Sequence, residues 1–308
     1  MEPHSHPPAC GLRKSPNSEF YLKHCYRFGQ RERLVDHEET LSDVSTVQLS
    51  ILQTPDADGR GNVLFLCEDG PEALVLKAYR RRWARWQDYS EALVSRLLLR
   101  TTGRCAGARW RTELSANRLW AQHGFDVFRI VDKPIPRNIP PPATWFEYCP
   151  GRVLRDLIRD QDVFWEEKMV LLRRLGSEMG RRHSLAMEIQ EPLLIQKHGT
   201  LEHVMISDER MITFDLEGSF RPGFDLLEAL AQELSGYLRS IAKTTGDLCE
   251  NSFKALASGY EDQDLLKKVV DWGVNGKTLY RHFTRRQDRR RRPVNGKVAA
   301  LVRLHQLL

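Results

Sequence analysis

Residues 198–217 read HGTLEHVMISDERMITFDLE, and this stretch is the most informative part of the chain. Two short apolar runs, 204–206 and 211–214, flank a polar turn at 207–210, and this pattern predicts two β-strands joined by a tight turn. A loop containing two histidines precedes the first run, and Asp215 follows the second. A polar loop, a hairpin and a carboxylate therefore follow one another within twenty residues.

Three features lie upstream of this stretch. Gly59 and Gly61 belong to a turn between two β-like runs, where missing side chains let backbone N–H groups approach a phosphate. Lys77 closes a short apolar run that predicts a strand. Glu113 lies on a helical segment that begins near Arg109. Each feature is common when it occurs alone, so their order in the chain carries the information.

That order matches a kinase-like phosphotransferase. In such enzymes a strand lysine holds the α- and β-phosphates and pairs with a helix glutamate, and a catalytic loop and a metal-binding Asp follow. Lys77, Glu113 and Asp215 would fill these positions, with ATP and Mg²⁺ as the cofactors, because Mg²⁺ is a hard cation that prefers oxygen ligands. We therefore expect an α+β, protein-kinase-like bilobal fold with a small antiparallel β-rich N-lobe and a larger, mainly α-helical C-lobe.

The expected domain boundaries follow shifts in composition. Residues 1–40 are polar and rich in His and Pro near the start, which predicts a partly flexible N-terminal extension. Residues 41–146 form the expected N-lobe and residues 147–284 the expected C-lobe. Residues 285–308 form a basic tail with a short amphipathic helix.

At this point the sequence resembles the Kdo/WaaP-type lipopolysaccharide kinase family, relatives of the protein kinases that phosphorylate inner-core sugars of bacterial lipopolysaccharide. The resemblance runs from about residue 47 to residue 289. It rests on four motifs in a shared order: FEYCPGRVL at 146–154, FDLE at 214–217, YLRSI at 237–241 and SGY at 258–260. The family has Asp-Leu where protein kinases have Asp-Phe-Gly.

The resemblance implies a function and further site residues. It implies an ATP-dependent kinase that adds phosphate to a sugar hydroxyl of the lipopolysaccharide inner core. It also implies that the segment containing Glu147 and Cys149 is the hinge between lobes, where adenine bonds to backbone groups. A protein or a small metabolite is an alternative acceptor, since related kinase-like families use both.

The catalytic loop departs from the protein-kinase pattern H-R-D-x-x-x-x-N, and two alignments are open. Alignment on the His-Gly pair puts Thr200 at the Asp position and Met205 at the Asn position, where a thioether is a poor Mg²⁺ ligand. Alignment on the following strand puts His198 and His203 at these positions, and WaaP-type kinases resemble this in carrying a His in place of that Asn. We favour the second alignment. Neither retains the usual Asp.

The loss of that Asp leaves two functional hypotheses. General-base assistance contributes about 10²- to 10⁴-fold, while positioning and charge stabilisation supply most of the acceleration of phosphoryl transfer. An active kinase would therefore use His198 or Glu202 to take the proton, with Asp215 and His203 at the metal. The alternative is a catalytically impaired pseudokinase that acts as a nucleotide-binding regulatory module in envelope biogenesis.

Composition limits the partners. The 308 residues are 41% hydrophobic and 29% charged, which excludes wholesale disorder and a multi-span membrane protein. Seven arginines lie between Arg281 and Arg292 against the single acid Asp288, so this segment accounts for the whole formal net charge of +6. The basic run Arg285–Arg292 beside an amphipathic helix predicts contact with an anionic membrane surface. Nucleic acid is the less favoured partner, because no recognisable nucleic-acid-binding motif accompanies the run.

The sequence also gives an expected location. It shows no secretory signal and no apolar stretch near the roughly 18 residues that a spanning helix needs. The 6 cysteines are scattered without a C-x-x-C pair, which favours reduced thiols. We therefore expect a cytoplasmic protein that can also attach peripherally to the inner face of the bacterial inner membrane.

Overall fold

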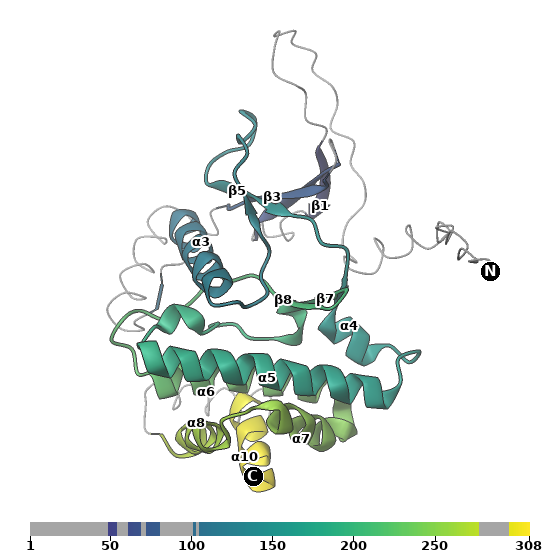
Figure 1. The fold of residues 1–308 in the computed structure, drawn as a ribbon, viewed down its shortest axis with the longest axis vertical. Helices are drawn as coiled ribbons and strands as arrows, with labels where there is room; N and C mark the ends of the chain where they lie inside the picture. Colours follow the sequence, from purple (N-terminus) through teal and green to yellow (C-terminus); the bar gives the residue numbers. More distant parts are fainter. Residues whose placement is uncertain (1–48, 54–60, 69–71, 81–100, 103–104, 277–295) are drawn as a thin grey trace, which may run out of the picture. The chain divides into compact units, whose positions relative to one another are not determined.

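The computed structural model describes residues 49–53, 61–68, 72–80, 101–102, 105–276 and 296–308 (Figure 1). Contacts divide the chain into residues 1–40 and residues 41–308, and every described residue belongs to the second unit. The expected N-terminal extension, Gly59 and the basic run 285–292 therefore lie outside the described residues.

The first part of the unit is an antiparallel sheet of five strands in the order β1-β2-β3-β5-β4. The strands are β1 (Leu49–Gln53), β2 (Val63–Cys67), β3 (Leu74–Ala78), β4 (Ile130–Val131) and β5 (Ala143–Glu147). The apolar runs VLFLC and LVLKA form the neighbouring strands β2 and β3, as their β-branched and aromatic content predicts. A small core that includes Leu76 and Trp145 fixes their register. The sequence reading of a small antiparallel sheet is confirmed.

Helix α3 (Ala106–Gln122) lies between β3 and β4 in the chain, and Figure 1 shows it beside the sheet. It begins three residues before Arg109, close to the predicted start. Its C-terminal end contacts the helical part of the unit, because Trp120 is buried in that core and its indole N–H donates to the carbonyl of Leu193 at 2.9 Å. One helix thus joins the two parts.

The helical part begins with a small sheet in the order β6-β7-β8, from β6 (Arg152–Val153), β7 (Val204–Ser207) and β8 (Arg210–Thr213). The β7–β8 pair is the hairpin predicted from the 198–217 stretch, with Met205 opposite Ile212. The helices are α4 (Leu154–Arg159), α5 (Trp165–Ile189), α6 (Leu226–Thr245), α7 (Cys249–Gly259), α8 (Gln263–Asn275) and α10 (Lys297–Leu307), with single 3₁₀ turns at Pro192–Leu194, Leu201–His203 and Gly246–Leu248. The α+β class with a mainly helical second part is confirmed.

Helix ends follow local chemistry. The carboxylate of Asp225 accepts hydrogen bonds from the first free backbone N–H groups of α6, and Asp262 does the same for α8. Gly246 ends α6 with a φ of 58°, a conformation in which glycine carries little steric cost. These residues fix where α6 begins and ends and where α8 begins.

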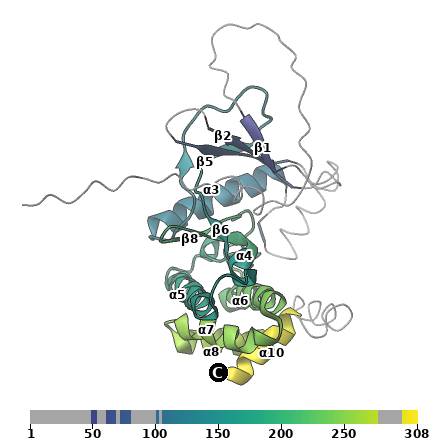
Figure 2. The same ribbon diagram turned by 90° about the vertical axis from the view of Figure 1, so that its right-hand side faces the viewer.

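The helices pack closely in the larger core. Helix α5 packs against α7 and α6 against α8, as Figure 2 shows. A Cβ on Gly259 of α7 would lie 1.8 Å from the carbonyl oxygen of Arg173 on α5, so the backbones themselves are in contact there. Helix α10 packs on α6 and α8 with Leu301 and Leu304 buried. The apolar face of the predicted C-terminal amphipathic helix is therefore covered by protein, and only the undescribed Arg285–Arg292 run is left for the predicted membrane contact.

Within the described residues, no helix combines the length and the apolar composition that crossing a bilayer requires.

Candidate functional site

Lys77 lies on β3, in the middle of the five-stranded sheet, opposite Leu64 and Thr144. It is only 8% exposed, which is unusual for a lysine and requires a counter-charge. Its Nζ lies 3.0 Å from Oε1 and 2.8 Å from Oε2 of Glu113 on α3. The Tyr79 hydroxyl donates to the same Glu113 carboxylate at 2.7 Å. The predicted pairing of strand lysine and helix glutamate is therefore present in the structure.

Asp215 follows β8 and comes to the same lysine from the helical part. Its Oδ1 lies 3.2 Å from Nζ of Lys77. Its φ is 62°, and a non-glycine residue at positive φ is uncommon and often marks a functional site. The backbone is therefore strained at Asp215, the residue that the sequence predicts as a metal ligand.

His203, not Met205, is the loop residue beside Asp215. Its Nε2 lies 3.5 Å from Oδ2 of Asp215, and its Nδ1 is 2.9 Å from the backbone carbonyl oxygen of His198. Met205 instead lies inside β7, and Thr200 caps the 3₁₀ turn by accepting a hydrogen bond from the backbone N–H of Glu202 at 3.2 Å. The geometry therefore favours the alignment that puts His198 and His203 at the Asp and Asn positions.

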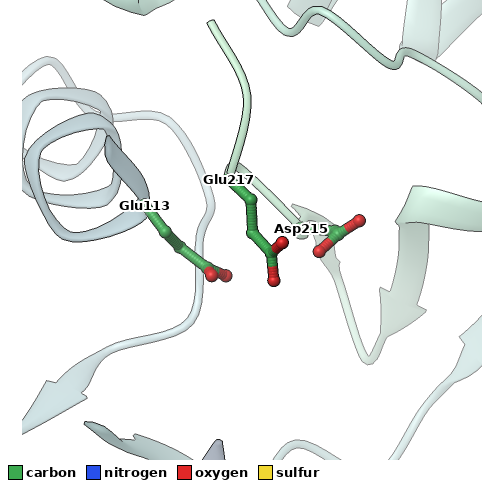
Figure 3. A group of neighbouring side chains, drawn as sticks. All are labelled: Glu113, Asp215 and Glu217. Carbon is green, nitrogen blue, oxygen red and sulfur yellow. The ribbon is translucent and has the colours of Figure 1, made fainter. Parts of the chain in front are cut away.

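Glu217 is the last residue of the FDLE motif, and the sequence pattern predicts no separate role for it. It is buried, its Oε1 lies 2.8 Å from Nζ of Lys77, and its Oε2 lies 2.7 Å from Nη1 of Arg109. Figure 3 shows the carboxylates of Glu113, Asp215 and Glu217 coming together from α3 and from the segment after β8. Oxygens of all three lie within 4.8 Å of one another.

The carboxylates and the lysine shift one another's pKa values. Burial alone would lower the pKa of Lys77, but Glu113, Glu217 and Asp215 outweigh it and raise that pKa well above its usual value. Burial raises the pKa of Glu113 to about 7 despite the attraction of Lys77. Burial opposes ionisation of Glu217 too, but Lys77 and Arg109 hold its pKa below the usual range. Lys77 therefore stays protonated, and a further positive charge near the three carboxylates would be attracted to them.

This donor set fits Mg²⁺. Carboxylate oxygens are the ligands that hard divalent cations prefer, and three of them converge here around one buried lysine. Asp215 and Glu217 would hold the cation, with Glu113 close by and His203 at the far oxygen of Asp215. The positive charge would also offset the cost of keeping several carboxylates out of water.

The two predicted base candidates lie in different surroundings. Removal of the imidazole from water, followed by the charges of Lys197 and Lys297, lowers the pKa of His198 to about 4, although the residue as a whole is exposed. His198 is therefore neutral at physiological pH. The side chain of Glu202 is 54% exposed and its Oε1 lies 2.6 Å from Nη1 of Arg155 on α4. The structure ties Glu202 to that arginine and does not bring it to Lys77 or Asp215.

Of the two predicted hinge residues, Glu147 is the last residue of β5 and Cys149 follows two residues later. Oε1 of Glu147 lies 3.1 Å from Nη1 of Arg210 on β8, and its side chain also accepts from the backbone N–H of Arg129 at 3.0 Å. Burial, followed by the charge of Glu147, raises the pKa of the Cys149 thiol to about 11, so the thiol stays protonated. Side-chain contacts of Glu147 thus join the end of the large sheet to the small one, and both hinge roles remain predictions.

Gly61, the described member of the predicted glycine pair, lies two residues before the start of β2 and has a φ of 111°. This backbone conformation is strained for any residue with a side chain. The next residue, Asn62, donates its side-chain amide to Oε1 of Glu217. The turn is therefore connected to the carboxylate cluster.

A buried network supports the loop before Asp215. The side-chain amide of Gln196 donates to the backbone carbonyl of Phe214 at 3.0 Å, and its oxygen accepts from the hydroxyl of Tyr237 at 2.9 Å. The backbone N–H of Gln196 donates to Glu233 at 3.0 Å, and Glu233 also pairs with Arg182 on α5 at 2.6 Å. Helices α5 and α6 thus hold the backbone that precedes Asp215.

Taken together, these elements form an α+β structure that agrees with the expected kinase-like arrangement: an antiparallel sheet carries the lysine, a helix carries its glutamate, and a helical part carries the loop and the acidic residues.

No family model matches the sequence, and no curated protein matches it. The structure is similar to that of a microcompartment-associated aminopropanol kinase, at 10% identity and a TM-score of 0.35, over 85% of this chain and 92% of the other. A likeness this distant assigns neither a family nor an activity. The resemblance to the lipopolysaccharide kinases therefore stays an expectation from the sequence.

Proposed function

We propose that this chain is an ATP- and Mg²⁺-dependent phosphotransferase that acts on an alcohol. One observation carries the proposal. A buried lysine on the sheet lies 2.8 Å from a helix glutamate and 3.2 Å from an acidic residue after the β7–β8 hairpin. Triphosphate binding needs positive charge on one side and a metal-holding carboxylate on the other, and Lys77 and Asp215 supply both.

Each residue has a distinct role in this proposal. Lys77 binds the phosphates and Glu113 keeps its ammonium aimed. Asp215 and Glu217 hold Mg²⁺, which supplies charge neutralisation for the transferred phosphoryl group. His203 orients Asp215, and His198, which is neutral at pH 7, accepts the proton of the acceptor hydroxyl.

We also propose which class of molecule accepts the phosphate. The four motifs shared with the lipopolysaccharide kinases support a sugar hydroxyl of the lipopolysaccharide inner core or of a related glycolipid. Such substrates are assembled on a membrane, and the basic run Arg285–Arg292 supports attachment to an anionic surface. Flotation with vesicles of anionic lipid, compared with neutral vesicles, tests that attachment.

The activity is tested by offering γ-labelled ATP with core oligosaccharide, lipid and protein fractions in parallel. We expect label in the oligosaccharide, and we expect Asp215→Ala to abolish it. Asp132→Ala is the matched control, because Asp132 is exposed and lies outside the carboxylate cluster. Equal transfer by Asp215→Ala and the unmodified chain would falsify the assignment.

A second candidate is a nucleotide-binding module without transfer activity. The observation that favours it is the catalytic loop, where His198 stands at the Asp position and its pKa is lowered to about 4, so it is a weak base. This candidate predicts that ATP stabilises the protein against heat, with or without Mg²⁺, while no fraction accepts label. Transfer to any fraction rejects it.

A further inference from the structure

Arg109 is a buried cation that neither the sequence motifs nor the kinase-like pattern assigns. It lies on α3 one turn before Glu113, so both side chains leave the same face of the helix. It is 2% exposed. Its Nη1 lies 2.7 Å from Oε2 of Glu217 and 2.8 Å from Oδ1 of Asn62, and its Nη2 donates to the backbone carbonyl of Arg80.

These contacts join four parts of the site. Asn62 lies at the glycine turn, Arg80 follows β3, Glu217 follows Asp215, and Arg109 itself belongs to α3. A guanidinium has five N–H donors in a rigid plane, so one side chain can bond several acceptors in fixed directions. An ammonium has no such fixed geometry.

The contacts also distinguish the two oxygens of Glu217. Oε2 is bound by Arg109, while Oε1 accepts from the side-chain amide of Asn62 and lies 2.8 Å from Nζ of Lys77. Since Lys77 also contacts Glu113 and Asp215, Oε1 is the oxygen that faces the other two carboxylates. Exchange of the two oxygens by rotation of the Glu217 carboxylate would break these contacts, and the bond from Arg109 is the contact that holds Oε2.

We propose that Arg109 is a positioning residue that holds Oε2 of Glu217 so that Oε1 faces a divalent cation shared with Asp215. The inference rests on the proposed function, because it takes Glu217 as a metal ligand. It adds that the ligand is oriented from α3, the helix that also aims Lys77 through Glu113. Hydrogen-bonded partners of ligating carboxylates are worth about 10- to 100-fold in metal affinity.

Mn²⁺ binding without nucleotide tests this role, measured from the electron paramagnetic resonance signal of free Mn²⁺. We expect Arg109→Met to weaken Mn²⁺ binding about 10- to 100-fold. Arg109→Lys should recover part of the loss, because an ammonium restores the charge but not the fork of donors. Arg118→Met is the matched control on the same helix, exposed and outside the carboxylate cluster, and should bind as the unmodified chain does.

A double-mutant cycle separates positioning from a general effect on folding. In a Glu217→Gln background, Arg109→Met should cause little further loss of Mn²⁺ affinity, because the oriented ligand is already gone. Full additivity, or a folded Arg109→Met chain that binds Mn²⁺ as tightly as the unmodified chain, overturns the inference. If Arg109→Met does not fold, Arg109→Lys decides, and an unchanged Mn²⁺ affinity in that variant also overturns it.

The outcome for the proposed function is read separately. The unmodified chain can bind Mn²⁺ with an affinity that depends on Glu217 and Arg109 and still transfer no label from ATP. That result supports the positioning role and rejects the phosphotransferase. An unmodified chain that binds no Mn²⁺ rejects the positioning role.

Discussion

The ammonium nitrogen of Lys77 lies 3.2 Å from a carboxylate oxygen of Asp215, although the two residues are 138 positions apart in the sequence. One residue belongs to the large sheet and the other follows the small one. Glu113 and Glu217 reach the same ammonium, each at 2.8 Å. Lys77 is therefore the charge around which the proposed site is organised.

Lys77→Met should destabilise the protein and make its stability depend on Mg²⁺. Removing the lysine takes the ammonium partner away from the buried Glu113, while Glu217 keeps its contact with Arg109. Loss of one partner costs about 3 to 5 kcal/mol in comparable buried pairs. A divalent cation can replace the lost charge, so Mg²⁺ should raise the thermal midpoint of this variant more than that of the unmodified chain. Differential scanning calorimetry with and without Mg²⁺ measures both effects. Lys254→Met, at an exposed position on α7, is the control. A Lys77→Met chain as stable as the control at pH 7 would contradict this account.

Gln196→Ala should lower turnover without removing Mg²⁺ binding. Gln196 is 1% exposed and fixes the carbonyl of Phe214, the residue before Asp215. Small misplacements at a reacting centre can cost about 10²-fold in rate. Steady-state kinetics at saturating Mg²⁺ should therefore show a loss in kcat larger than the change in KM for ATP. Gln122→Ala, at the exposed end of α3, should behave as the unmodified chain does. A selective rise in KM would point to a different role.

Substitution of His198 and substitution of His203 should have different effects on the kinetics. His198→Ala should reduce kcat by about 10²-fold or more if it accepts the proton, with the Mg²⁺ requirement unchanged. His203→Ala should instead raise the Mg²⁺ concentration needed for half-maximal rate, because it contacts Asp215 at 3.5 Å. Glu202→Gln, whose carboxylate pairs with Arg155, should retain near-normal kcat. If Glu202→Gln loses more activity than His198→Ala, the proton acceptor is Glu202.

The pH dependence of the rate tests His198 further. Its pKa is lowered to about 4, so its protonation state does not change between pH 6 and 8. We therefore expect that the plot of kcat against pH has no inflection near pH 6.5 caused by His198. Any inflection found there should persist in His198→Ala. An inflection that disappears in His198→Ala would show that His198 titrates at its ordinary pKa.

Glu233 should make the fold sensitive to acid. Burial alone would raise its pKa, but Arg182 and His183 lower the pKa to about 2 from an ordinary value of 4.5. Because the folded state holds this carboxylate ionised, its contribution to stability is complete above about pH 4.5 and is lost as the pH falls towards 2. That shift corresponds to roughly 3 kcal/mol. Urea unfolding of Glu233→Gln should show a loss of about this size at pH 7 and a smaller loss at pH 3. A loss that does not depend on pH would contradict the linkage.

The order of local patterns predicted the fold and part of the site. Lys77 and Asp215 were predictable because Lys77 lies near the end of one short apolar strand and Asp215 follows another, and period and turn signals place such strands well. Glu113 was chosen by its place on the following helix, and its contact with Lys77 agrees with that choice. These predictions needed only short-range patterns and a known order of parts.

Other site residues depend on contacts that local patterns do not encode. Arg109 resembles a solvated charge on a polar helix face, and only the packing of α3 against the segment after β8 buries it. Gln196 gives no signal, because its role is a single bond to the backbone of Phe214. For Glu217 the signal in the sequence is its place two residues after Asp215, which keeps a second carboxylate close to the first along the chain.

The carboxylates around Lys77 have a kinetic consequence for any ligand. Their oxygens already bond to Lys77 and Arg109, so an arriving triphosphate with its cation must exchange partners with groups that hold one another. Association then resembles ligand substitution at an occupied centre, where the departure of the old partner limits the rate. The observed rate constant should level off as nucleotide concentration rises, and the plateau would report how fast the internal ion pairs open.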